Sequence, residues 1–138
     1  MYSMKIRALK GRAQITSAFR RGKKFASDSL IVHCRTRKHA NESDAPEGGN
    51  QDLFIICAVR KKQVPLAVTR NRIKRIVRES ARAFMKSHPV LPFMTLAFVW
   101  QKPMKHHSEA QTTEIKPQVE DVLNQAMQYF SGKQEMLP

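Results

Sequence analysis

Basic side chains between Arg60 and Arg82 are the residues of this sequence with the clearest chemical potential. The segment reads RKKQVPLAVTRNRIKRIVRESAR, and residues 70–82 hold five arginines with Glu79 as their one acid. Arginine suits phosphate because its planar guanidinium donates hydrogen bonds in a fork. Contacts of this kind give affinity for a polyanion with little sequence information. The segment therefore predicts a phosphate-binding surface.

Helical periodicity sorts residues 70–86 into two faces. The apolar side gathers Ile73, Ile76, Val77, Ala83 and Phe84, and the opposite side gathers Asn71, Arg75, Arg78, Arg82 and Lys86. Like charges three or four residues apart, such as Arg75 and Arg78, destabilise a helix by about a few tenths of a kcal/mol per pair. A solvated basic face is the simpler interpretation, but repulsion on this scale favours an external anion that relieves it.

The charge of the whole chain is divided into blocks. The 138 residues include 25 Lys and Arg against 11 Asp and Glu, a formal net charge of +14. Residues 1–41 carry +10 and residues 53–108 carry +11, whereas residues 42–52 carry −4 and residues 109–138 carry −3. Such segregation indicates a polyanionic partner, with nucleic acid the first candidate and an anionic membrane surface the second.

Several other functions lack their sequence signals. The longest apolar runs, such as Leu53–Val59, fall far short of the roughly 20 residues of a membrane span. The N-terminus carries charges where a signal peptide needs an apolar core, so a cytoplasmic protein is expected. Cys34 and Cys57 form no Cys-x-x-Cys pair and are expected to be free thiols. No catalytic residue and no metal ligand is predicted, and His106 and His107 are interpreted as exposed bystanders.

The expected elements form one domain over residues 1–138. They are a helix at 9–20, a strand centred on Leu30–Cys34, a strand at 53–59, a helix at 68–86, a strand at 94–100 and a helix at 116–130 closed by Gly132. Residues 38–51 are expected to be an acidic and polar loop, and residues 131–138 a C-terminal tail. The order α-β-β-α-β-α predicts an α+β sandwich around a central sheet.

The run from Arg60 to Arg82 resembles the signature of the bacterial ribonuclease P protein component. In that family a Lys-Lys pair at a strand end is followed by Ala and then by a helix that begins Arg-Asn-Arg and ends in Arg-Glu. The matching residues here are Arg70, Asn71, Arg72, Lys74, Arg75, Arg78, Glu79 and Arg82. Leu9 to Phe19 and Gly22 are similar to the family's first helix and the glycine after it. The resemblance also implies a left-handed βαβ crossover.

This resemblance implies a function in tRNA processing. Family members are RNA-binding subunits of a ribonucleoprotein endonuclease, a hydrolase that removes the 5′ leader of precursor tRNA. The catalytic RNA carries the chemistry and binds most of the Mg²⁺. The implied RNA-binding residues are Arg60, Lys61, Lys62, Arg70, Asn71, Arg72, Lys74, Arg75, Arg78 and Arg82. The implied leader-binding residues are Phe19 and His33, for which a core position and an exposed strand position are the simpler interpretations.

Two other functions stay open at the level of sequence. A structural ribosomal or chromosomal protein would also carry one basic helix, since composition does not separate RNA from DNA. The Lys-Lys pair before the Arg-Asn-Arg helix argues against that class. An amphipathic helix on a membrane surface is a poorer interpretation, because Phe84 is the one aromatic residue on its apolar side.

Overall fold

One mixed sheet of five strands and three helices makes up the part of the chain that the computed structural model describes, residues 6–36, 53–87, 93–103 and 113–136. The strands are β1 Ile6–Ala8, β2 Lys23–Ala26, β3 Leu30–Thr36, β4 Leu53–Val59 and β5 Phe93–Trp100. The helices are α1 Arg12–Arg21, α2 Ala67–Ser87 and α4 Ile115–Met136. The loop predicted at 38–51 and the pair His106–His107 lie outside the described residues.

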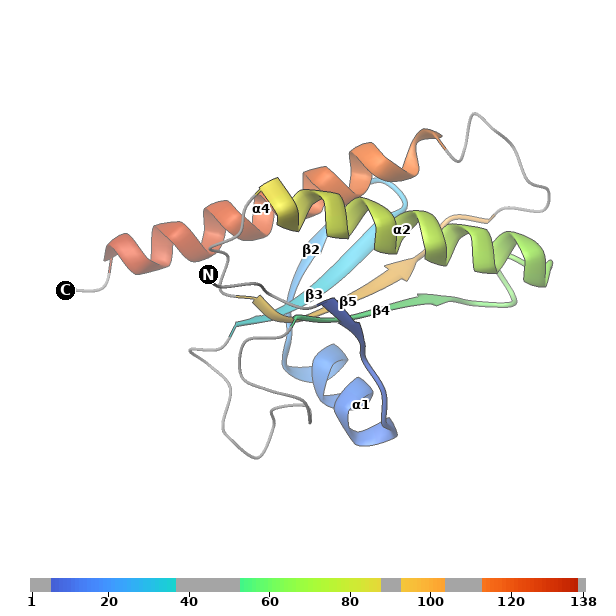
Figure 1. Cartoon of the computed structure of the whole chain (residues 1–138), viewed down its shortest axis with the longest axis horizontal. Helices are drawn as coiled ribbons and strands as arrows, with labels where there is room; N and C mark the ends of the chain where they lie inside the picture. Colours follow the sequence, from blue (N-terminus) through green and yellow to red (C-terminus); the bar gives the residue numbers. More distant parts are fainter. Residues whose placement is uncertain (1–5, 37–52, 88–92, 104–112, 137–138) are drawn as a thin grey trace.

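The strand order β1-β4-β5-β3-β2 places β5 at the centre of the sheet. β1 and β5 both run parallel to β4, whereas β3 is antiparallel to β5 and β2 is antiparallel to β3. Parallel neighbours need a crossover, and α2 supplies it between β4 and β5. α2 and α4 lie over one face of the sheet and α1 lies under the other (Figure 1).

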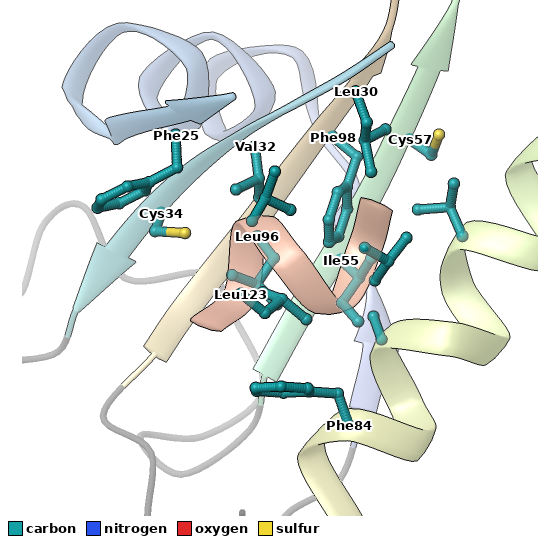
Figure 2. Close-up of a cluster of buried hydrophobic side chains, with 14 of the residues drawn as sticks. Phe25, Leu30, Val32, Cys34, Ile55, Cys57, Phe84, Leu96, Phe98 and Leu123 are labelled. Atoms are coloured by element: carbon teal, nitrogen blue, oxygen red, sulfur yellow. The ribbon is translucent and has the colours of Figure 1, made fainter. Parts of the chain in front are cut away.

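Side chains on the α2 and α4 face build the larger core. Leu30, Ile55, Leu96 and Phe98 point from the strands toward Phe84 of α2 and Leu123 of α4 (Figure 2). A smaller cluster on the opposite face holds Leu9, Ala18, Phe54 and Ala97, with Ile15, Phe19 and Ile56 packed against it. Since alternate strand residues face opposite sides, these two clusters divide the side chains of β4 and β5 between them.

α4 is tied to the β2–β3 edge of the sheet by hydrogen bonds. The backbone N–H of Ser29 donates to Gln118 Oε1 at 2.6 Å, and Gln125 Nε2 donates to the carbonyl of Ala26 at 3.1 Å. Its buried side carries the apolar residues Val119, Val122, Leu123, Ala126 and Phe130. The helical spacing of these residues predicts such a core stripe, which also includes Met127, and Met127 is half-buried. None of the helices in the described ranges is long and apolar enough to cross a membrane.

The structure corrects four expectations about elements. The strands β1 and β2 are absent from the predicted order, because strands of three and four residues are too short to give a period that stands out. The first helix begins at Arg12 and not at residue 9, and Leu9 instead donates its N–H to Ile55 O at 2.9 Å. Gly22 ends α1 as predicted. The last helix continues through Gly132 to Met136, so the predicted tail is helical almost to its end.

The apolar face predicted for residues 70–86 is correct except at one position. Ile73, Val77 and Phe84 are buried, and Ile76 is half-buried. Ala83 is exposed, and Ala81 is buried in its place. Alanine is small enough for either side of a helix, so its type alone does not place it.

Candidate nucleic-acid interface

α2 exposes most of the predicted RNA-binding residues along one side. We call the exposed residues Asn71, Arg72, Arg75, Arg78 and Arg82 the basic face of α2. The opposite side of the helix buries Ile73, Val77 and Ala81 against the sheet and α4, so packing fixes which way the arginines point. Lys74 lies at the border between the two sides and is half-buried.

The basic face of α2 has little internal compensation for its charge. Within the residues that the structure describes, Arg72, Arg75, Arg78 and Arg82 make no ion pair. The charges of Arg78 and of the neighbouring Lys74 also reach the thiol of Cys57 beneath the helix. Burial raises the pKa of Cys57 to about 12, and the charges of Lys74 and Arg78 oppose that rise. A polyanion on this face would therefore meet cations that are held by the fold and not already neutralised.

A tight turn brings a second group of cations beside the start of α2. β4 ends at Val59, and Val64 N–H then donates to the carbonyl of Arg60 at 2.9 Å. Val64 is fully buried, whereas the predicted contacts Arg60, Lys61 and Lys62 are exposed. The buried valine holds the turn against the core. We call residues 60–63 the basic turn.

Arg70 connects the basic turn to α2. Its Nη1 donates to the carbonyls of Val64 at 2.9 Å and Pro65 at 2.8 Å. The side chain is half-buried, unlike the exposed Arg72 and Arg75. Because its guanidinium is bonded to two carbonyls, Arg70 has a structural role and fixes where the basic turn sits relative to the helix. Sequence spacing shows only that Arg70 lies in the motif, and the role of positioning the turn is visible only in three dimensions.

Phe19 and His33, the two predicted leader-binding residues, lie together on the other face of the sheet. Their ring centroids are 5.2 Å apart in an edge-to-face arrangement. Phe19 projects from the last turns of α1 and is half-buried, as is His33 on β3. Two aromatic rings in contact beside basic residues form the kind of surface on which unpaired bases stack. We call Phe19 and His33 the aromatic pair.

Gly22 allows the close approach that brings the aromatic pair together. A Cβ at this position would lie 2.6 Å from the carbonyl oxygen of Ala18 and 2.9 Å from the Cβ of His33. Only glycine lets the end of α1 pass so near to β3. Burial lowers the pKa of His33, and the neighbouring charge of Lys24 lowers it further. His33 is therefore a neutral ring near pH 7 that offers stacking and hydrogen bonding.

Arg35 is a buried cation that the sequence patterns did not indicate. It is 6% exposed on β3, two residues beyond His33 and on the same face, and its Nη1 donates to Ser17 Oγ of α1 at 2.9 Å. The alternation of strand side chains places Arg35 beside His33 as soon as His33 is assigned to the α1 side. That signal is present in the sequence, but a cation inside an apolar strand contradicts the usual expectation of burial.

Neither a metal centre nor a nucleophile is evident in the described part of the chain. No group of three or more His, Cys, Asp and Glu lies together there, so no magnesium site is assigned to these residues. Cys34 and Cys57 are free and buried, and burial raises the pKa of both thiols. A raised pKa keeps a thiol protonated and unreactive at neutral pH.

The fold and these surfaces define a class: small, strongly basic α+β proteins with one helix below a mixed sheet and two above it. The chain belongs to the ribonuclease P family, because the model of the family described as Ribonuclease P matches residues 4–127. This confirms the family that the motif from Arg60 to Arg82 indicates.

Individual relatives agree with the family assignment. The chain is 36% identical over 70 residues to the Ribonuclease P protein component of Psychrobacter sp. (strain PRwf-1), a match over 51% of this chain and 49% of that protein. It thus spans about half the length of this curated relative. One structure of Staphylococcus aureus RNase P protein has a TM-score of 0.62 and 25% identity over 92% of this chain and 94% of its own. A second has a TM-score of 0.60 and 24% identity over 87% and 94%.

Proposed function

We propose that this chain is the protein subunit of ribonuclease P. In this proposal it binds the catalytic RNA through the basic face of α2 and the basic turn, and it holds the 5′ leader of precursor tRNA on the opposite side of the sheet. The RNA subunit, with Mg²⁺, cleaves the phosphodiester bond that releases the leader. The protein contributes electrostatic affinity and substrate positioning.

The exposed arginines of α2 are the observation that supports this proposal most strongly. Four guanidinium groups at the spacing of successive helical turns repel one another unless an anion lies between them. The phosphates of a folded RNA supply such anions at regular intervals. Each arginine can donate two hydrogen bonds to one phosphate. This geometry favours contacts with the RNA backbone and requires no particular base.

The aromatic pair supports the assignment of the leader. A leader varies in sequence among precursors, so its site has to accept any base. Stacking on an aromatic ring meets that requirement because every base has a π face, and it contributes about 1–3 kcal/mol per base. A purely structural ribosomal protein needs no such pair on the face opposite its basic helix, so the aromatic pair favours ribonuclease P over that alternative.

Reconstitution with a bacterial ribonuclease P RNA tests the proposal. The purified chain should lower the Mg²⁺ concentration that the RNA needs to cleave precursor tRNA, because its cations replace part of the ionic screening and hold the leader. A short polylysine with the same net charge of +14 controls for non-specific screening. If the chain binds the RNA no better than the reference does and leaves the Mg²⁺ requirement unchanged, it is a nucleic-acid-binding protein of another kind.

A further inference from the structure

A pocket of about 170 Å³ lies where the parallel strands β4 and β5 end. It is lined by Arg60 and Gln63 of the basic turn, by Val99 and Trp100 of β5, and by Gln101, which follows that strand. Open sheets with parallel strands bind ligands in crevices outside the carboxyl ends of those strands. The pocket includes no residue of the basic face of α2 or of the aromatic pair, and Arg60 is its one member among the contacts that the family resemblance implies.

Two carboxamide side chains reach this pocket from backbone that the fold holds in place. The backbone N–H of Gln101 donates to the carbonyl of Ser29 at 2.8 Å, which ties the end of β5 to the neighbouring β2–β3 hairpin. The backbone N–H of Gln63 donates to the carbonyl of Arg60 at 3.1 Å, inside the turn that the buried Val64 anchors. The distance between the two carboxamides is therefore limited by the fold and not only by side-chain rotation.

The chemistry of these carboxamides fits the edge of a nucleobase. Gln63 is half-buried and Gln101 is exposed, and in the described part of the chain neither side chain has a hydrogen-bond partner. A carboxamide presents a donor and an acceptor in one plane. A phosphate has only acceptors and would leave the carboxamide oxygens unmatched. Adenine offers a donor next to an acceptor, and glutamine recognises it through two hydrogen bonds.

The other lining residues match the remaining parts of a nucleotide. Arg60 is exposed, and the five residues that line the pocket include no carboxylate to neutralise it. Its guanidinium donors suit the phosphate next to a bound base. Val99 is half-buried and adds an apolar surface for the face of the base. The volume lies below the roughly 300 Å³ at which sites for free small molecules begin, so it favours a single base that projects from a polymer.

The pocket lies between the two RNA surfaces of the proposed function. The side chain of Val99 is on the same face of β5 as that of Ala97, because strand residues alternate. Ala97 belongs to the smaller cluster and pairs in register with His33 of the aromatic pair. Arg60 and Gln63 belong to the basic turn. An RNA strand on either surface therefore passes close to the pocket.

We propose that this pocket, which we call the carboxamide pocket, binds one unpaired adenine of RNA. Gln63 and Gln101 form hydrogen bonds with the edge of the base, and Arg60 donates to the adjoining phosphate. The 5′ leader of precursor tRNA and an unpaired segment of the catalytic RNA offer the same chemistry. The inference rests on the proposed function and adds a preference for one base, which stacking and phosphate contacts alone do not provide.

Three fluorescent oligoribonucleotides test the preference for adenine with the full, unmodified chain. The first is a short oligouridine, the second carries adenosine at one central position, and the third carries purine riboside there, which lacks the 6-amino group. The adenosine oligonucleotide should bind about tenfold more tightly than the purine oligonucleotide, because only adenine offers both hydrogen-bonding groups. Equal affinity for these two would overturn the proposal, and no variant that fails to fold enters this comparison.

Replacement of both glutamines assigns the preference to the carboxamides. Gln63→Met combined with Gln101→Met keeps the side-chain length and removes the hydrogen-bonding groups. This double variant should bind the adenosine and purine oligonucleotides equally well, while its affinity for oligouridine and its melting temperature stay the same. The matched control is Gln128→Met, at an exposed position on α4 outside the pocket. A double variant that still prefers adenosine, or a control that no longer does, would contradict the proposal.

Replacement of Arg60 tests the phosphate contact. Arg60→Met should weaken binding of all three oligonucleotides about tenfold, since a charge-assisted contact is lost, and should leave the preference for adenosine unchanged. Lys116→Met removes the same charge from an exposed position on α4 outside the pocket and should have a smaller effect. Equal losses in the two variants would refute a phosphate contact at Arg60, because they would show a response to net charge alone.

The source of the adenine is identified by binding the double glutamine variant to larger RNAs. A loss of affinity for precursor tRNA in the reconstituted enzyme, with none for mature tRNA, assigns the adenine to the leader. A loss for the catalytic RNA alone assigns it to that RNA, and no loss in either experiment would contradict the proposal. The oligonucleotide titrations use the chain without these RNAs, so they still test the pocket if the chain fails to lower the Mg²⁺ requirement. A chain that lowers this requirement without preferring adenosine would retain the proposed function and refute the present inference.

Discussion

The basic face of α2 and the aromatic pair lie on opposite sides of one sheet and differ in how they are supported. The arginines of the basic face of α2 are exposed, repel one another and share only the helix as their frame. Phe19 and His33 touch each other, pack on the smaller core and depend on Gly22 for their contact. The first surface can adapt to the partner's backbone, whereas the second is set by the fold. The proposed function thus assigns affinity and positioning to different sides of the molecule.

The largest expected effect concerns RNA binding by the basic face of α2. Replacing Arg72 and Arg75 together by alanine should weaken binding to a ribonuclease P RNA by about 3 kcal/mol, or roughly a hundredfold, because two charge-assisted contacts are lost. The plot of log K against log salt should become shallower by roughly one unit per phosphate contact. Filter binding over a salt series measures both. A weaker complex with an unchanged slope would place these arginines outside the interface, and circular dichroism checks that α2 is intact.

The next largest effect concerns precursor binding by the aromatic pair. Phe19→Ala should weaken binding of precursor tRNA to the reconstituted enzyme about tenfold through lost stacking, while binding of mature tRNA stays the same. Ile15→Ala is the matched control, because Ile15 packs on the same small cluster without an aromatic ring. If both variants lose affinity to the same extent, Phe19 acts through core packing and the contrast between the two surfaces disappears.

Replacement of Arg70 tests whether the fold also fixes the position of the basic turn beside α2. Arg70→Met removes two hydrogen bonds to the carbonyls of Val64 and Pro65 and should lower the free energy of unfolding by about 1–2 kcal/mol. If Arg70 positions the basic turn, the variant should also reduce the effect of Lys62→Ala on RNA affinity. A double-mutant cycle measures this coupling. Strictly additive effects would make Arg70 an ordinary phosphate contact.

The smallest effect is a pH dependence of stability. The pKa of His33 is lowered in the folded chain, so the unfolded chain binds more protons in the interval below its ordinary value of 6.5. Acidification through that interval should therefore destabilise the protein, and His33→Gln should reduce this loss. Urea unfolding of both proteins between about pH 7 and pH 5 measures the difference. If the free energy of unfolding has the same pH dependence in the wild-type chain and in the variant, the pKa of His33 is not lowered by folding.

Elements with long, regular patterns could be predicted from the sequence. α2 spans 21 residues with alternating apolar and basic sides, and its predicted boundaries fall within one residue of Ala67–Ser87. β4 and β5 are apolar runs bounded by polar residues and were also correctly placed. The family motif lies on the same long helix. The hand of the crossover stays a prediction from the resemblance.

Other features depend on contacts between distant residues. β1 is three residues long and forms because Ile6 to Ala8 pair with Leu53 to Ile55. The pattern of apolar and polar residues near β1 does not predict this pairing. The bond of Arg35 to Ser17 likewise joins residues that are 18 positions apart in sequence. The RNA contacts assigned by resemblance to Asn71 and Lys74 stay predictions, as does each of the others, since the structure contains no RNA.

The central position of β5 also determines when the protein can become functional during its synthesis. β5 is the last strand of the described chain to be translated, yet it joins β4 with β1 on one side to β3 with β2 on the other. A nascent chain that has not reached Trp100 has two strand pairs with no strand between them, and non-local pairing of this kind forms late. Both proposed RNA surfaces should therefore appear together only after β5 has been translated, so that chains without β5 do not compete for RNA.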